Sequence, residues 1–300
     1  MEILNILNEH YPLRFDKYEH LRDGGSTSYA VFSGGIKYFL RVIKPAFFDT
    51  AVKGVEVQVF LQSKDFSVPR VIHAIDELPY VRTTDELYVL YEFVEGSEVD
   101  PEQDAEAIGA LIGNLHKTMD DYPNEFILRD KHFYIGRYID ILRNKNYPRT
   151  EEFFNYGEQL WDKIKDLPHG FCHGDMYSGN IHKTLDGRLF LLDFDTSSEG
   201  FPMYDPALIC NMTHYFDFDE NGYGKSKEVF SRFLIEYLKY NTLSQKEIGA
   251  FFHMIALYHF ALQATIIEIH GLDCVDNAFL DKQLEWLYRW RKQCENEVRI

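Results

Sequence analysis

Short apolar runs broken by turn residues dominate the N-terminal part of the chain. The pair Gly34-Gly35 stands between two β-rich runs, a pattern typical of a β-hairpin. A further β-rich run spans 87–94, whereas residues 50–63 carry apolar side chains at helical spacing. The pattern therefore predicts that residues 1–95 form a strand-rich region with one main helix.

Beyond this region the apolar positions follow the helical period. Residues 104–119 place their apolar side chains on one face, as expected for an amphipathic helix. Two short strands flank the turn at 185–187. The boundary between a strand-rich N-lobe, 1–95, and a helix-rich C-lobe, 96–300, is therefore predicted near 94–100. Further helices are predicted over 132–145, 151–166, 205–216, 225–241, 245–268 and 277–297.

The charge balance narrows the range of partners. The chain has 31 basic and 48 acidic residues, a net charge of −17. Nucleic acid and anionic membranes are therefore not expected as partners, because phosphate contacts need concentrated Lys and Arg. The acidic balance permits a cationic substrate, although acidic surfaces also simply favour solubility.

The remaining composition indicates an ordinary globular protein. Four scattered cysteines form no Cys-x-x-Cys pair, so we expect neither a disulfide framework nor a zinc site. The N-terminus does not resemble a signal peptide, and no apolar stretch approaches the length of a membrane span. A cytoplasmic location is expected.

One segment carries the strongest chemical signal. The sequence HGDMYSGN, residues 173–180, holds Asp175 and, five positions later, Asn180. A tight hairpin then delivers Asp193 from the end of an apolar strand. The oxygens of Asn180 and Asp193 suit Mg²⁺, which leaves its other positions for phosphate and water. Asp175 is then free to orient a hydroxyl and accept its proton, as phosphoryl transfer requires.

These residues resemble a kinase catalytic loop, H-x-D-x-x-x-x-N, followed by Asp-Phe-Asp in place of Asp-Phe-Gly. With Tyr204-Asp205-Pro206, the stretch 171–206 resembles the aminoglycoside phosphotransferase and choline kinase superfamily. The resemblance implies an α+β, bilobal protein-kinase-like fold, with a five-stranded antiparallel N-lobe and a mainly helical C-lobe. It also implies ATP-dependent phosphorylation of a small-molecule hydroxyl, on an aminoglycoside-like antibiotic, choline, homoserine or a sugar-like alcohol.

The resemblance also implies a nucleotide site in the N-lobe. The loop 23–28 would cover the phosphates of ATP, which involves Ser26, Thr27 and Ser28. Arg41 occupies the place of the usual third-strand lysine, with Lys44 as the alternative. Its expected acidic partner on the following helix is Glu56, against the simpler interpretation of a solvated glutamate.

The strand that ends near residue 94 resembles the hinge between kinase lobes. Tyr91 would take the gatekeeper place, and backbone groups of Glu92 and Val94, on either side of Phe93, would contact adenine. Backbone recognition leaves little side-chain signature, so GTP remains an alternative to ATP.

Other polar residues receive mainly structural interpretations. His116 and His173 are expected to form hydrogen bonds, and Asp205 to cap a helix. Asp195 is a candidate for orienting the loop, assisting the metal or contacting substrate. Asp217, in the acidic cluster at 217–220, is a candidate for a substrate ammonium group, against a solvated loop.

Two other functions compete with a small-molecule kinase. A protein kinase is disfavoured because the chain lacks an A-P-E element and a long segment after Asp193. A non-catalytic nucleotide-binding regulatory protein is disfavoured because Asp175, Asn180 and Asp193 are all present. The expected partner is a small-molecule hydroxyl substrate, and the protein is expected to be a monomer or a homodimer.

Overall fold

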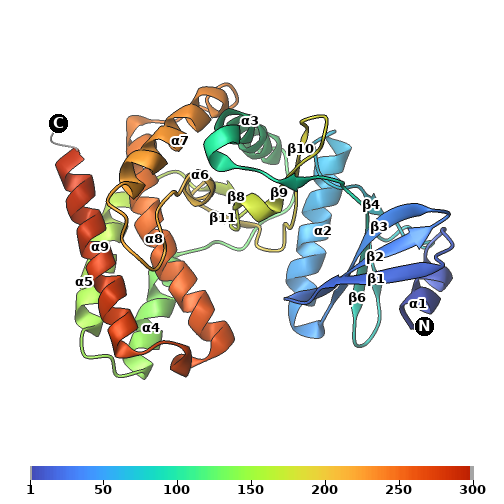
Figure 1. Cartoon of the computed structure of the whole chain (residues 1–300), viewed down its shortest axis with the longest axis horizontal. Helices are drawn as coiled ribbons and strands as arrows, with labels where there is room; N and C mark the ends of the chain where they lie inside the picture. The colour runs from blue at the N-terminus through green and yellow to red at the C-terminus, as the bar shows by residue number, and fades with distance from the viewer. Residues whose placement is uncertain (1, 298–300) are drawn as a thin grey trace. The chain divides into compact units, whose positions relative to one another are not determined.

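The computed structural model describes residues 2–297, and these form two compact units. Unit 1 contains the chain up to Val99 together with 121–123 and 178–197, and unit 2 contains the remainder. This division differs from the expected lobes mainly at 178–197, which clusters with unit 1. The reason is that its hairpin pairs with a strand at the end of the N-terminal region. The expected α+β class is confirmed: antiparallel strands dominate unit 1, and helices dominate unit 2 (Figure 1).

An antiparallel sheet of order β1-β2-β3-β6-β4 forms the centre of unit 1, and β5 also pairs with β6. It has six strands where five were expected, because β4 and β5 are separate two-residue strands along β6. The elements are α1 (Glu2–His10), β1 (Lys17–Arg22), β2 (Ser26–Ser33), β3 (Ile36–Ile43), α2 (Phe48–Ser63), β4 (Val71–Ile72), β5 (Val81–Arg82) and β6 (Leu87–Glu92).

The two helices of unit 1 cover opposite faces of this sheet (Figure 1). Leu40 of β3 belongs to a buried cluster with Leu7 of α1, whereas Ile43 belongs to a second cluster with Ala51 of α2. Successive strand residues point to opposite faces, so Arg41 lies on the face that α2 covers. Arg41 therefore shares a face with Ile43 and points away from the cluster of Leu40 and Leu7.

A second, small sheet in unit 1 joins β7 (Ser97–Glu98), β9 (Ile181–Lys183) and β10 (Leu189–Leu191). The turn between β9 and β10 needs Gly187, whose φ is +84°, a conformation that side chains disfavour. Gly96, before β7, lies so close to β9 that a Cβ atom would fall 2.7 Å from a carbonyl oxygen. The hairpin is thereby fixed to the end of the N-terminal region.

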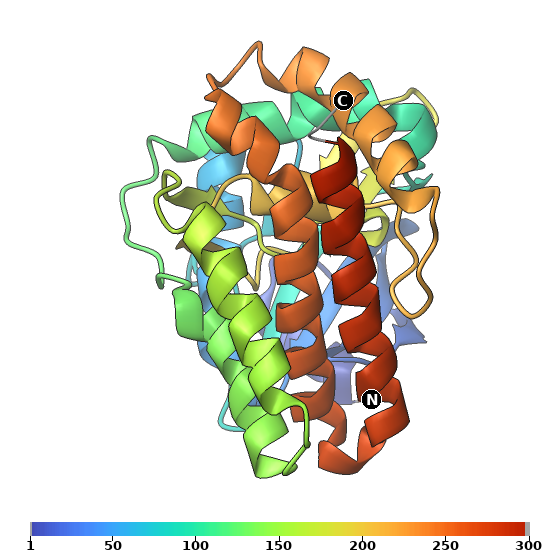
Figure 2. The same ribbon diagram turned by 90° about the vertical axis from the view of Figure 1, so that its left-hand side faces the viewer.

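Unit 2 is built mainly from helices, and three of them, α5, α8 and α9, run side by side (Figure 2). A short antiparallel pair, β8 and β11, completes it. The elements are α3 (Pro101–Met119), a π-helical turn (His132–Gly136), α4 (Arg137–Asn144), α5 (Thr150–Ile164), β8 (Gly170–Cys172), β11 (Ser198–Gly200), α6 (Tyr204–Ile209), α7 (Gly222–Tyr237), α8 (Gln245–His270) and α9 (Asn277–Glu297).

Helix α8 forms the centre of unit 2 and contacts α4, α5, α6 and α9. It is the one helix within residues 2–297 that is long and apolar enough to cross a membrane, and 67% of its most apolar window is buried in the protein. The expectation that no apolar stretch approaches the length of a membrane span is therefore wrong for 245–270. The burial of Met254, Leu257 and Phe260 accounts for its apolar character as that of a core helix.

Candidate active site

The end of the β9–β10 hairpin brings Asn180 and Asp193 together in unit 1. Ile181 pairs with Leu191, and the N–H of Leu192 donates to the carbonyl of Asn180 at 2.9 Å. Asn180 and Asp193 therefore leave the same end of the hairpin, as their spacing predicted. Asp193 has a φ of +57°, a conformation that Asp tolerates better than most residues.

Arg41 faces the carboxylates that follow this hairpin. Its two terminal nitrogens contact Asp195 at 3.2 and 2.7 Å, and one lies 3.5 Å from Asp193. Its Nε donates to the hydroxyl of Ser26 at 3.3 Å. Burial alone would lower the pKa of the guanidinium, but the two carboxylates outweigh burial and raise the pKa. Arg41 is thus a fixed cation at the place where phosphate binding was predicted.

The expected pairing of Arg41 with Glu56 is wrong in this structure. Glu56 is exposed on α2, whereas Asp195 forms the two-point contact with Arg41. Helix α2 instead presents Gly54 to this region, where a Cβ atom would lie 2.7 Å from Asp195 Oδ1 and 3.0 Å from its backbone nitrogen. The glycine lets the helix pack directly against the backbone that carries Asp195.

The predicted phosphate loop is shorter than expected. Residues 26–28 belong to β2 and pair with β3, so only 23–25 lie outside the strands. Ser28 is buried opposite Arg41, Thr27 donates to Asp23 at 3.0 Å, and Ser26 contacts Arg41. Of the three candidates for phosphate contact, Ser26 therefore bonds to Arg41, and Ser28 is the buried cross-strand neighbour of Arg41.

The predicted hinge residues lie at the end of β6, with Tyr91 and Glu92 inside the strand and Phe93 and Val94 directly after it. The buried Tyr91 lies on the α2 face, and burial, together with the negative charges of Asp195 and Asp193, raises the pKa of its hydroxyl although the charge of Arg41 opposes the shift. The N–H of Glu92 donates to a backbone carbonyl at 2.8 Å, so it is not free to contact a nucleotide. Phe93 and Val94 lie in non-strand chain and are half-buried.

The residues of this region fit a magnesium ion shared with a nucleotide. Asn180 and Asp193 offer hard oxygen atoms, and the Asp193 side chain is 34% exposed and lies 3.5 Å from Arg41. Within residues 2–297, no group of three His, Cys, Asp or Glu side chains has the arrangement of a metal site. A divalent cation would therefore need phosphate and water oxygens to complete its coordination.

In unit 2, a buried carboxylate holds the loop that carries Asp175. Asp205 accepts the backbone N–H groups of His173 and Gly174 at 2.7 and 2.8 Å. The φ of Gly174 is +82°, and the N–H of Asp175 lies 3.4 Å from His173 Nδ1. Asp205 is fully buried, so it fixes the loop from inside unit 2 and leaves Asp175 exposed.

Asp205 was expected to cap α6, but the structure corrects this interpretation. It lies inside the first turn of α6, and its third partner is Nε2 of the buried His116, at 3.1 Å. Nδ1 of His116 contacts the Tyr237 hydroxyl at 2.8 Å. Burial would raise the pKa of Asp205, but the hydrogen bond from His116 and the neighbouring positive charge hold it below its usual value. The expected hydrogen-bonding roles of His116 and His173 are both observed.

A cavity of about 400 Å³ opens beside Asp175. Burial and the charge of Asp175 raise the pKa of Tyr258 to about 12, so this phenol stays neutral. A pocket with both polar and apolar lining next to an exposed carboxylate can hold a small polar molecule. Its lining residues are Asp175, Met176, Tyr177, Leu208 and Tyr258.

Asp217 does not line this cavity. It forms an ion pair with Lys282 of α9, which lowers the pKa of Asp217, and it is 65% exposed. The solvated-loop interpretation fits this position better than a substrate contact. Asp195, the other candidate for substrate, is committed to Arg41 in unit 1.

Sequence reasoning missed several residues that shape these regions. Asp205 was assigned to a helix cap, and neither Gly54 nor Tyr258 was singled out. The pair of Asp205 with His116 joins residues 89 positions apart, and that of Arg41 with Asp195 joins residues 154 apart. No local spacing signals such pairs. The glycine within the helical pattern at 50–63 was the one available signal of a close approach.

Comparison with known proteins identifies the family. Residues 18–241 match the sequence profile of the family described as Phosphotransferase enzyme family, APH. No curated protein sequence matches the chain significantly.

Solved structures share the fold over nearly the whole chain. One is amicoumacin kinase hAmiN in complex with AMP-PNP, Ca²⁺ and Ami, with a TM-score of 0.75 and 18% identity over 99% of this chain and 93% of that one. A microcompartment-associated aminopropanol kinase has a TM-score of 0.73 and 17% identity, over 99% and 97% of the two chains. The Plasmodium vivax ethanolamine kinase has a TM-score of 0.63 and 15% identity, over 92% and 84%. The profile match covers well over half of the sequence, so the chain belongs to the phosphotransferase enzyme family.

Proposed function

We propose that this protein transfers the γ-phosphoryl group of ATP to a hydroxyl of a small molecule. The observation that carries this proposal is the pair of oxygen-bearing side chains, Asn180 and Asp193, at one end of a hairpin whose following carboxylate binds Arg41. Phosphoryl transfer from a nucleoside triphosphate requires side chains that hold a metal ion and a cation that contacts the phosphates. Asn180 and Asp193 would serve as the metal ligands, and Arg41 would serve as the cation. Solved relatives that bind AMP-PNP or ADP support ATP as the donor.

The proposed roles divide between the two units. In unit 1, Arg41 would bind phosphate oxygens, and Asn180 and Asp193 would hold Mg²⁺. When bound, the ion would neutralise charge on the phosphates during transfer. In unit 2, Asp175 would orient the acceptor and take its hydroxyl proton while the hydroxyl oxygen bonds to the γ-phosphorus. The bond between that phosphorus and the leaving oxygen of ADP breaks in the same step. Asp205 would keep the loop of Asp175 in place.

The Asp175 cavity favours a small alcohol that carries a positive charge. Its lining contains no Lys or Arg, and it offers the rings of Tyr177 and Tyr258 beside a carboxylate. Aromatic faces and carboxylates attract ammonium groups. The names of two structural relatives, an aminopropanol kinase and an ethanolamine kinase, support this choice.

A coupled ADP-release assay with magnesium-ATP tests this proposal. The panel comprises amino alcohols, choline, homoserine, neutral sugars and aminoglycosides, and GTP is tested beside ATP. We expect a small cationic alcohol to stimulate ADP release more than a neutral alcohol of similar size. If nucleotide binds but no acceptor stimulates release, the protein is a nucleotide-binding regulatory protein instead. A preference for neutral sugars would contradict the proposed acceptor class.

A further inference from the structure

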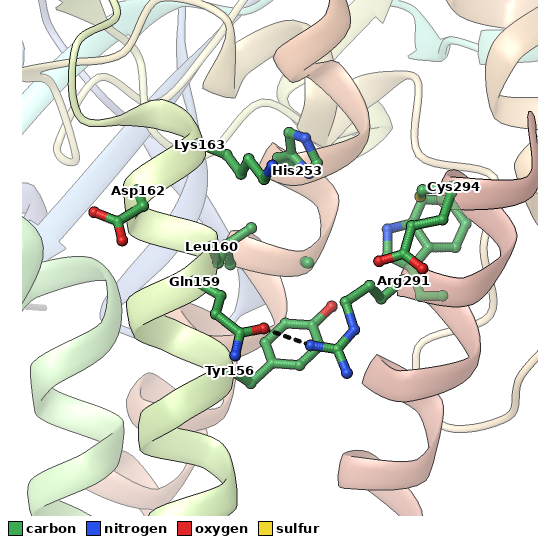
Figure 3. Close-up of a pocket in the computed structure, with 11 residues that line it drawn as sticks. Tyr156, Gln159, Leu160, Asp162, Lys163, His253, Arg291 and Cys294 are labelled. Carbon is green, nitrogen blue, oxygen red and sulfur yellow. Dashed lines mark hydrogen bonds between the residues drawn. The ribbon is translucent and has the colours of Figure 1, made fainter. Parts of the chain in front are cut away.

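The charged side chains around Arg41 in unit 1 converge on one point, because two carboxylates of the segment 193–195 contact this cation. The groove among α5, α8 and α9 in unit 2 differs. Its lining carries charges of both signs, such as those of Asp162 and Lys163 (Figure 3). The proposed transfer gives a role to the first carboxylate of the segment, Asp193, and none to the second.

The two carboxylates hold Arg41 unequally. Asp195 contacts both terminal nitrogens of Arg41, at 3.2 and 2.7 Å, whereas Asp193 contacts one of them, at 3.5 Å. A two-point contact fixes the plane of a guanidinium as well as its place. The Asp193 side chain is also more exposed than that of Asp195. Asp195 is therefore the carboxylate that orients Arg41, and Asp193 keeps the more accessible oxygens.

The packing of α2 leaves this place to Asp195. A Cβ atom on Gly54 would lie 2.7 Å from Asp195 Oδ1, and this oxygen is the one that contacts Arg41 at 3.2 Å. At this point α2 therefore presents backbone without a side chain. Glu56, two positions farther along the helix, is exposed. The partner of Arg41 thus comes from the segment after the hairpin and not from α2.

Both sides of this contact are fixed before a nucleotide binds. Phe194, between the two carboxylates, is 1% exposed, and its carbonyl accepts the N–H of Ser197 at 3.0 Å. On the other side, Arg41 lies within the paired strand β3, and its Nε donates to the Ser26 hydroxyl at 3.3 Å. With Nε and both terminal nitrogens in contact, the guanidinium keeps one direction. Such preorganisation lowers the cost of binding a charged group.

We propose that Asp195 is the positioning residue of Arg41, in the role expected from the sequence for Glu56, and that it affects the phosphates of ATP only through this cation. The inference rests on the proposed function, in which Arg41 binds phosphate oxygens. Without the Asp195 carboxylate, the guanidinium turns toward Asp193, the other carboxylate that it contacts. Arg41 then loses the orientation in which it meets the phosphates.

Nucleotide affinity, measured by calorimetry on the full chain without an acceptor, tests this inference. We expect Asp195→Asn to weaken the binding of magnesium-ATP by at least about tenfold. Adenosine, which has no phosphates and is measured by competition, should bind within about twofold of the wild type. A general loss of structure would weaken both ligands alike. The matched control Glu56→Gln removes an exposed carboxylate from α2 and should bind both ligands as the wild type does.

A double-variant cycle separates positioning from metal binding. If Asp195 acts through Arg41, Arg41→Gln/Asp195→Asn should bind ATP within about twofold of Arg41→Gln alone, because the effects of coupled residues do not add. Additive losses would overturn the inference. A loss in Asp195→Asn that a raised magnesium concentration restores would also overturn it, since that result identifies Asp195 as a metal ligand.

Thermal unfolding shows whether each variant keeps its fold, and Asp195→Ala replaces Asp195→Asn if the latter unfolds. Unchanged ATP affinity in a folded Asp195 variant would overturn the inference and leave the proposed function standing. A wild-type protein that binds magnesium-ATP no more tightly than adenosine would instead overturn both, because Arg41 would then have no phosphate to contact.

Discussion

Single buried polar residues in unit 2 hold the loop of Asp175 in place. Asp205 accepts three hydrogen bonds, two from the loop backbone and one from His116. Hydrogen bonds to a buried charge contribute more to stability than neutral ones, and loss of one partner leaves the others unsatisfied. Asp205 thus positions the loop of Asp175 from inside unit 2, without a contact to substrate.

Substitution of this carboxylate tests its role. In Asp205→Asn, an amide N–H₂ replaces one acceptor oxygen and faces a backbone donor. We expect the free energy of unfolding to fall by about 3 kcal/mol, and turnover to fall as the loop loses its anchor. The control Asp217→Asn alters an exposed carboxylate and should change neither quantity appreciably. Chemical denaturation of both variants measures the difference, and equal effects would contradict the account.

A second buried polar residue makes stability depend on pH. Burial lowers the pKa of His259 to about 3, and the ring stacks between Tyr215 and Trp286. In the unfolded chain its pKa is about 6.5. Its contribution to stability is therefore complete above pH 6.5 and is lost as pH falls from there toward 3.

The variant His259→Phe keeps an aromatic ring but cannot take up a proton. Below pH 6 the wild-type free energy of unfolding should fall about 1.4 kcal/mol per pH unit more steeply than that of the variant. Denaturation at pH 7 and pH 5 measures this difference. His270→Gln, an exposed position at the end of α8, should keep the wild-type dependence. If the free energy of unfolding of His259→Phe fell with pH as steeply as that of the wild type, His259 would not be the source of the pH dependence.

At the scale of elements, the close packing of α2 decides where Asp195 lies. A Gly→Ala change inside a helix normally stabilises by about 1 kcal/mol. At Gly54 the added Cβ would meet the side chain and backbone of Asp195. We therefore expect Gly54→Ala to raise the KM for ATP and lower turnover without stabilising the protein.

Gly249→Ala in α8 is the matched control, because nothing lies within 4 Å of its Cβ position. This variant should gain stability and keep full activity. Steady-state kinetics and thermal unfolding of both variants compare the two helices. If Gly54→Ala kept the wild-type KM and turnover, the position of Asp195 beside Arg41 would not depend on the close packing of α2.

Long helices and strands were predictable from the sequence because their apolar period is local. The helices predicted at 104–119, 151–166, 245–268 and 277–297 correspond to α3, α5, α8 and α9. Predicted helix 205–216 ends early, at Ile209, where the Asn211 side chain bonds to the N–H and hydroxyl of Thr213. The short strands β9 and β10, which flank the turn at 185–187, were predicted, whereas β7, β8 and β11 were missed because each pairs with a distant segment.

At the scale of the whole molecule, the residue types of the motif were predictable from the sequence. The residues that hold the motif in place were not. The spacing of Asp175, Asn180 and Asp193 depends on one continuous segment, whereas the partners of Arg41 and of the Asp175 loop come from distant parts of the chain. Physical contact between remote residues leaves no pattern in a single sequence. The family match confirms the resemblance that the motif indicated.

The proposed reaction depends most directly on Asp175 as the group that accepts the hydroxyl proton. The decisive measurement is acceptor-dependent ADP release by Asp175→Asn, with magnesium-ATP affinity measured on the same sample by calorimetry. We expect turnover to fall by at least about a hundredfold, while ATP affinity stays close to that of the wild type. Turnover within about threefold of the wild type, in a variant that still binds ATP, would contradict it.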